Sequence, residues 1–232
     1  MTQRNLSRIP TVRLARIAFL ALLLSAGSAA ATPLLSEVYY DAPGSDDGAV
    51  FVELSGPAGF ALDGWWVDGV NGSNGAVGPS IALSGAIGAD GLFVLADRFS
   101  DGTTAVANAD LLANFDFQNG PDSVVLRDET SGFRDALGYG VFGPDEIFAG
   151  EGTAAPDGAA GESLARRFAN LDTDDNAADF VLLSDPTPGE ASFAVIPEPG
   201  TGLLMALGLA GLGTAGRPVS RDPGEAGGDF RR

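Results

Sequence analysis

Short apolar segments recur at intervals of roughly ten residues from Thr32 onward, separated by Gly, Asp, Asn and Pro. Strands of this length with turn residues between them are typical of an antiparallel β-sandwich or barrel, and no stretch here favours a long helix. The Gly-rich segments 69–79 and 141–162 are predicted as loops. The predicted strands are residues 34–40, 50–54, 65–67, 81–83, 91–96, 111–117, 123–127, 133–139, 163–168 and 178–183.

The only two tryptophans, Trp65 and Trp66, are adjacent in the central segment 50–69. Successive side chains of a strand point to opposite faces, so one indole is expected in the core and the other on the far face or at a rim. A tryptophan on the far face offers a stacking surface for a carbohydrate, with Asp63 and Asp68 beside it. Core packing plus a rim aromatic is the simpler interpretation.

The first 31 residues have the three-part order of a secretory signal peptide. Four arginines without an acidic residue precede the apolar run 17–24, and Ala29 and Ala31 form the small-residue pattern before a cleavage site. We therefore expect signal peptidase to act on residues 1–31. The alternative, a membrane anchor, is disfavoured because the apolar run is short for a bilayer span.

Near the C-terminus, Pro197, Glu198 and Pro199 precede an apolar, Gly-spaced stretch, 203–215, and then Arg217. As a helix, such a stretch reaches about 20–22 Å, short of a bilayer core of about 30 Å, which favours a transient membrane passage over a permanent anchor. The pattern resembles the PEP-CTERM sorting signal of Gram-negative bacteria. The resemblance implies recognition by an exosortase and cleavage near the Pro-Glu-Pro motif.

Residues 32–196 hold five arginines and 27 acidic residues, which gives a formal charge of −22. Such a surface repels phosphate backbones, so nucleic-acid binding is not expected. The whole chain has no cysteine and no histidine, which excludes disulfides, thiolate metal sites and His-dependent catalysis. In this acidic setting Arg166 and Arg167 are expected to pair with the protein's own carboxylates.

Oxygen-bearing side chains alternate at Asp172, Asp174 and Asn176, and Asp179 follows. This spacing resembles the start of an EF-hand loop, which makes these four residues the candidate calcium ligands, although Ala177 stands where that loop has glycine. The alternative is a turn in which the carboxylates accept backbone N–H groups. Calcium is the only cofactor that the sequence suggests, and none is required.

Five segments follow one another along the chain: LLSEVYYDAPGSDDGAVFVEL (34–54), FALDGWWVDG (60–69), GADGLFVLAD (88–97), NGPDSVVLRDETSGFRDALGYG (119–140) and SLARRFANLDTDDNAADFVLLSDPTPG (163–189). Taken in order, they resemble the lamin tail domain, an immunoglobulin-like β-sandwich that also occurs in exported bacterial proteins. The resemblance covers about residues 34–190, and the long loop 141–162 departs from it. It implies an adhesion or interaction module.

The sequence therefore predicts three parts: a signal peptide (1–31), a lamin-tail-like β-sandwich (32–196) and a sorting signal (197–232). We expect a non-enzymatic module at the cell surface, in the outer membrane or in the secreted matrix of a Gram-negative bacterium, with exopolysaccharide or other surface proteins as partners. The alternative is an extracellular glycoside hydrolase that uses two carboxylates across an aromatic-lined cleft. Acidic loops such as the one with Asp41, Asp46 and Asp47 occur throughout the chain, so no single pair stands out.

Overall fold

Each of the ten predicted strand segments overlaps a strand in the computed structural model, which describes residues 32–130 and 132–194. The predicted processing residues Ala29, Ala31, Pro197, Glu198 and Pro199 lie outside the described residues. The strands are β1 (Leu34–Tyr39), β2 (Phe51–Ser55), β3 (Trp66–Asn71), β4 (Val77–Ala82), β5 (Leu92–Asp97), β6 (Leu111–Ala113), β7 (Asp122–Arg127), β8 (Phe133–Tyr139), β9 (Ser163–Arg166) and β10 (Phe180–Leu183).

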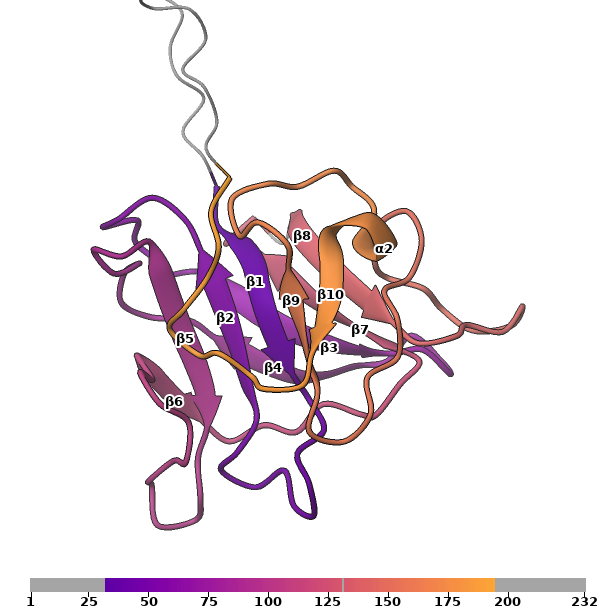
Figure 1. The fold of residues 1–232 in the computed structure, drawn as a ribbon, viewed down its shortest axis with the longest axis horizontal. Coiled ribbons are helices and arrows are strands. Elements are labelled where there is room, and N and C mark those ends of the chain that lie inside the picture. The colour runs from indigo at the N-terminus through magenta and orange to yellow at the C-terminus, as the bar shows by residue number, and fades with distance from the viewer. Residues whose placement is uncertain (1–31, 131, 195–232) are drawn as a thin grey trace, which may run out of the picture. The chain divides into compact units, whose positions relative to one another are not determined.

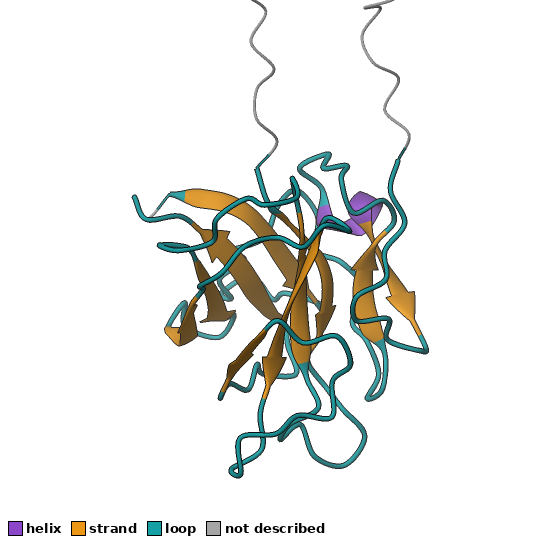
Figure 2. Ribbon diagram, turned by 90° about the vertical axis from the view of Figure 1, so that its left-hand side faces the viewer, coloured by secondary structure: helices purple, strands orange, loops and turns teal. Residues whose placement is uncertain are grey.

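The strands form two sheets that pack as a β-sandwich (Figures 1 and 2). One sheet has six strands in the order β10-β9-β1-β2-β5-β6, and the other has four in the order β4-β3-β7-β8. Neighbouring strands pair antiparallel, except that β6 runs parallel to β5. The predicted all-β sandwich is confirmed.

The core lies between the sheets and is made by alternate residues of both. Val38, Val52 and Leu95 come from the six-stranded sheet, and Val67 and Leu126 come from the four-stranded sheet; all five are fully buried. Because a strand presents every second side chain to one face, this alternation follows directly from the sequence pattern.

The tryptophan pair divides between the core and the outer face. Trp65 belongs to the core and packs edge-on against Phe60. Trp66 begins β3 on the outer face of its sheet, where the Arg127 guanidinium lies 4.5 Å from the ring centroid. The prediction of one core indole and one rim indole is confirmed.

The predicted loop 69–79 is wrong at both ends. β3 continues to Asn71 and β4 begins at Val77, so only a tight turn separates them. The Asn71 side chain accepts the Ser73 N–H (2.8 Å) and the Asn74 side chain accepts the Ala76 N–H (2.8 Å), which satisfies turn donors locally. Gly69 favours a loop in the sequence, but the structure places it within β3. Glycine is required there because a Cβ would lie 2.9 Å from the Phe117 ring.

Three predicted strands are at least two residues shorter than expected. β9 ends at Arg166, two residues before the predicted end. Residues 178–179 belong to a helical turn, α2 (Asn176–Asp179), capped at its start by the Asp175 side chain, and β10 begins only at Phe180. β6 ends at Ala113, because Phe115 and Phe117 turn into the core. Among the described residues, no helix has the length and apolar character to cross a membrane.

Both ends of the described chain lie at one end of the sandwich (the top of Figures 1 and 2). Pro33 packs against Gly56 and Phe193 against Gly91, while the Gly56 N–H donates to the Gly91 carbonyl (2.9 Å). β1 and β5 both start here, so the loops that follow them, 40–50 and 98–110, lie at the opposite end.

Candidate functional site

Arg166, in β9, is fully buried and joins both sheets. Its Nη2 donates to both carboxylate oxygens of Asp135 in β8 (2.8 Å each), and its Nε donates to the Leu35 carbonyl in β1 (2.9 Å). Its Nη1 donates to Asp179 (2.8 Å) and Asp172 (3.2 Å). The prediction that Arg166 pairs with the protein's own carboxylates is confirmed. The guanidinium suits this role because its planar fork presents several donors at once.

Arg167 behaves differently from its neighbour. It is exposed, and its Nε donates to the Ala178 carbonyl (2.9 Å) rather than to a carboxylate. The predicted pairing with carboxylates is therefore wrong for Arg167: strand alternation sends it away from the face on which Arg166 meets Asp135.

The predicted calcium ligands Asp172 and Asp179 already have protein partners. Both accept from Arg166, and Asp179 also accepts the Thr173 N–H (2.9 Å) and hydroxyl (2.7 Å). Asp174 is exposed in a left-handed backbone conformation, with φ of 55°, and its N–H donates to Asp172 (3.1 Å). Calcium binding at this loop stays a prediction, and it would compete with Arg166 for two carboxylates.

Asn176, the fourth predicted ligand, caps the edge of β8. Its amide nitrogen donates to the Ala136 carbonyl (2.7 Å), and its amide oxygen accepts the Gly138 N–H (2.8 Å), as a neighbouring strand would do. The same oxygen accepts the Glu151 N–H (2.8 Å). This fully buried side chain closes a sheet edge that would otherwise present unpaired backbone groups.

A carboxylate triad adjoins Arg166. Oxygens of Asp135, Glu151 and Asp172 lie within 4.8 Å of one another, and these are the carboxylates that could hold a metal ion among residues 32–130 and 132–194. Glu151 Oε2 is buried without a hydrogen-bond partner. Burial, and then the charges of Asp135 and Asp172, raise the pKa of Glu151 to about 8. Glu151 therefore holds a proton at neutral pH, which lowers the negative charge around Arg166.

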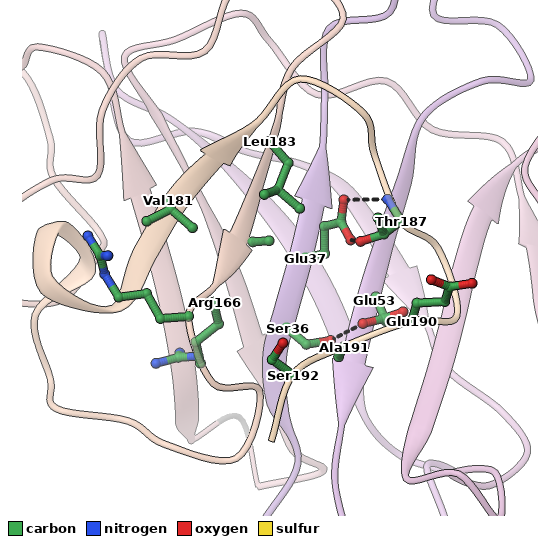
Figure 3. A pocket seen from close by; sticks show the side chains of 12 residues that line it. Ser36, Glu37, Glu53, Arg166, Val181, Leu183, Thr187, Glu190, Ala191 and Ser192 are labelled. Atoms are coloured by element: carbon green, nitrogen blue, oxygen red, sulfur yellow. Dashed lines mark hydrogen bonds between the residues drawn. The ribbon is translucent and has the colours of Figure 1, made fainter. Parts of the chain in front are cut away.

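A second buried acidic site lies on the outer face of the six-stranded sheet, under residues 184–194, here called the strap (Figure 3). Glu37 of β1 and Glu53 of β2 are directly opposite each other and are 1% and 0% exposed. A β-bulge in β1 turns Ser36 to the same face as Glu37, and the Ser36 hydroxyl donates to Glu53 (2.7 Å).

The strap donates to both glutamates. Glu37 accepts the Thr187 N–H (3.0 Å) and hydroxyl (2.7 Å), and Glu53 accepts the Gly189 N–H (2.7 Å). Ser163 of β9 donates its hydroxyl to Glu37 as well (2.5 Å). Beside the glutamates, a hollow of about 390 Å³ separates the strap from β9 and β10, as Figure 3 shows.

The pKa of Glu53 is raised to about 7, chiefly by burial, with smaller contributions from the charges of Glu37 and Asp90. Hydrogen bonds from Ser36 and Gly189 act in the opposite direction but do not offset the burial. Two buried carboxyl groups side by side, one of them titrating near neutral pH, form an arrangement that can hold and release a proton.

Asp63 and Asp68, the carboxylates on either side of the tryptophans, have different surroundings. Asp68 is buried, accepts from Ser80 (2.5 Å) and forms an ion pair with Arg127, whereas Asp63 is exposed in the preceding turn. Since Arg127 also lies over Trp66, one face of that ring is covered by the protein itself.

In the loop with Asp41, Asp46 and Asp47, carboxylates hold the backbone. Asp46 accepts the Ala42 N–H (2.6 Å). The pKa of Asp41 is raised by burial and by the charges of Asp46 and Asp157. Asp157 adjoins this loop because it accepts the hydroxyl of Tyr40, the residue before Asp41 (3.3 Å).

Sequence reasoning missed Glu37, Glu53, Asp135 and Glu151. Glu37 and Glu53 lie within predicted strands, and facing glutamates on paired strands follow only from the register. The chain matches no protein-family model, and no curated protein is found to match it.

Proposed function

We propose that this protein is an exported, non-enzymatic interaction module, a lamin-tail-like β-sandwich that a PEP-CTERM-type signal delivers to the surface or the extracellular matrix of a Gram-negative bacterium. The proposal combines the β-sandwich fold with the signal peptide and sorting signal predicted from the two ends of the sequence. Its partners would be extracellular polysaccharide or other surface proteins.

The observation that carries this proposal is the position of the chain ends. Pro33 and Phe193 lie at the same end of the sandwich, and the acidic loops lie at the other. A domain tethered through its C-terminus would therefore hold Asp41, Asp46 and Asp157 away from the tether. A cluster of negative charge in that position favours cationic groups, or anionic polymers bridged by divalent cations.

Intact-mass analysis of the protein from its native host tests the proposed export and sorting. We expect loss of residues 1–31 and of everything beyond about Pro199. Replacing Pro197, Glu198 and Pro199 with alanine should leave the tail attached and the protein in the membrane fraction. A native protein that retains both ends would refute the proposal.

A carboxylate-dependent glycoside hydrolase is the second candidate, and one observation favours it. Glu37 and Glu53 line a hollow, and one of the pair has a pKa near 7, as an acid–base pair requires. Against it, both carboxylates already accept hydrogen bonds from the strap. Release of reducing ends from host exopolysaccharide, lost in both Glu37→Gln and Glu53→Gln, would favour the hydrolase; no release by the wild type would eliminate it for that substrate.

A further inference from the structure

The strands of the six-stranded sheet hold the strap through two acidic side chains. Thr187 and Gly189 donate three hydrogen bonds to Glu37 and Glu53, at 2.7–3.0 Å. Four further hydrogen bonds join the strap to loops: Asn108 donates to the Pro188 carbonyl (2.8 Å), the Ala169 N–H donates to the Ser192 carbonyl (2.7 Å), and Asn170 exchanges two with Ala194 (2.7 and 3.0 Å). The attachment of the strap at Thr187 and Gly189 therefore depends on the state of the glutamate pair.

Within residues 32–130 and 132–194, no cation compensates this pair. The two arginines that line the hollow are engaged elsewhere, Arg166 with Asp135, Asp172 and Asp179, and Arg167 with a backbone carbonyl. The other charged groups nearby are acidic: Asp90, which precedes β5, and Glu190, which belongs to the strap.

Directly opposed like charges on paired strands are destabilising, and burial under the strap strengthens the repulsion. A single proton on the pair removes this repulsion and leaves acceptor oxygens for Thr187 and Gly189. When both glutamates are ionised, opening the strap admits water to both carboxylates and relieves the repulsion.

We propose that the strap is a latch whose closing depends on a proton held by the Glu37–Glu53 pair, so that it closes as pH falls and opens as pH rises. This inference concerns the described domain and does not depend on the proposed function. Opening releases Thr187 and Gly189 from Glu37 and Glu53, whereas the hydrogen bonds of the strap to Asn108, Ala169 and Asn170 do not involve the pair.

Hydrogen exchange of the purified protein between pH 6 and pH 8.5, corrected for intrinsic exchange rates, tests the latch. With a carboxyl pKa of about 7 when closed and 4.5 when open, the opening equilibrium of the strap should increase about tenfold over this range. The amides of Thr187 and Gly189 report the strap, and those of β7 (Asp122–Arg127) report global unfolding in the same sample. A strap signal that does not change relative to β7 overturns the proposal.

Glu53→Gln keeps the shape of the side chain but removes the titration. We expect the strap of this variant to exchange equally at pH 6 and pH 8.5, and the same tenfold change as in the wild type would overturn the proposal. Asp63→Asn, which removes an exposed charge in the turn before the other sheet, is the matched control and should behave as the wild type. Thr187→Val removes one donor and leaves the pair, so its strap should open more at every pH with an unchanged midpoint. The wild-type comparison decides the question even if Glu53→Gln fails to fold.

Discussion

Two of the buried carboxylate groups, the one around Arg166 and the one under the strap, are neutralised in different ways. The Arg166 guanidinium forms ion pairs with Asp135, Asp172 and Asp179. Under the strap, Glu37 and Glu53 have only hydroxyl and backbone N–H donors. An arginine keeps its charge at every accessible pH, whereas a proton is exchanged with solvent. The first group is therefore a fixed clamp, and the second responds to pH.

The two groups also differ in what they join. The Arg166 group links β1, β8, β9 and α2, and so ties the two sheets together at one edge. The glutamate pair links β1 and β2 to the strap and, through the Ser163 hydroxyl, to β9 in the same sheet. Loss of the first should therefore affect the whole fold, and loss of the second should affect one segment.

Arg166→Met has the largest expected effect, because it leaves Asp135 buried without a cation. We expect the free energy of unfolding to fall by about 3–5 kcal/mol, measured by urea denaturation. Arg167→Met is the matched control: its side chain is exposed with one backbone acceptor, so the loss should stay within about 0.5 kcal/mol. Equal losses of stability in the two variants would contradict the conclusion that the ion pairs of Arg166 hold the two sheets together.

Asn176→Ala should come next. It leaves two buried N–H groups and one carbonyl, those of Gly138, Glu151 and Ala136, without a partner, so we expect a loss of about 3 kcal/mol in thermal or urea unfolding. Asn74→Ala, an exposed asparagine with one turn hydrogen bond, should lose less than about 1 kcal/mol. A mild effect at Asn176 would mean that water replaces its side chain at the β8 edge.

The pH dependence of stability sharpens the comparison. The pKa values of Glu53 and Glu151 are raised to about 7 and about 8, so the stability that protonation gives is fully present below about pH 4.5 and is lost as pH rises through those values. We expect the free energy of unfolding to fall by about 3 kcal/mol from pH 6 to pH 8.5, about 1.4 kcal/mol of it from Glu53 and the rest from Glu151, whose share is reduced by solvent screening. Glu53→Gln should reduce this slope, whereas a slope of opposite sign would refute the assignment of both groups.

Calcium should have the smallest effect. A calcium-selective site filled to 100 times its Kd adds about 2.7 kcal/mol, or roughly 5–10 °C in a domain of this size. Because Asp172 and Asp179 are already paired with Arg166, we expect calcium to raise the midpoint no more than magnesium does. A calcium-specific rise that Asp174→Ala abolishes would establish the predicted site and show that Arg166 gives up its partners.

The positions of the strands could be predicted, but several of their ends could not. Period-two alternation and β-branched residues identify β7 within one residue of its bounds. At 69–79 and 176–179 the local signal is misleading. Gly69 lies in a strand because the Phe117 ring leaves no room for a Cβ there, and Asn176 hydrogen-bonds the backbone at the edge of β8. Phe117 and β8 both lie far from these residues in the sequence.

The amino-acid sequence by itself determined the all-β class, the division of the tryptophans between core and surface, and the pairing of Arg166 with carboxylates. These follow from side-chain alternation and charge, which are local or compositional properties. Only the tertiary structure decided which carboxylates meet: Glu37 faces Glu53 through strand register, and Asp135, Glu151 and Asp172 converge from three separate segments. Such encounters depend on long-range packing, and the pKa values that make them chemically distinct arise from burial, which exists only in the folded chain.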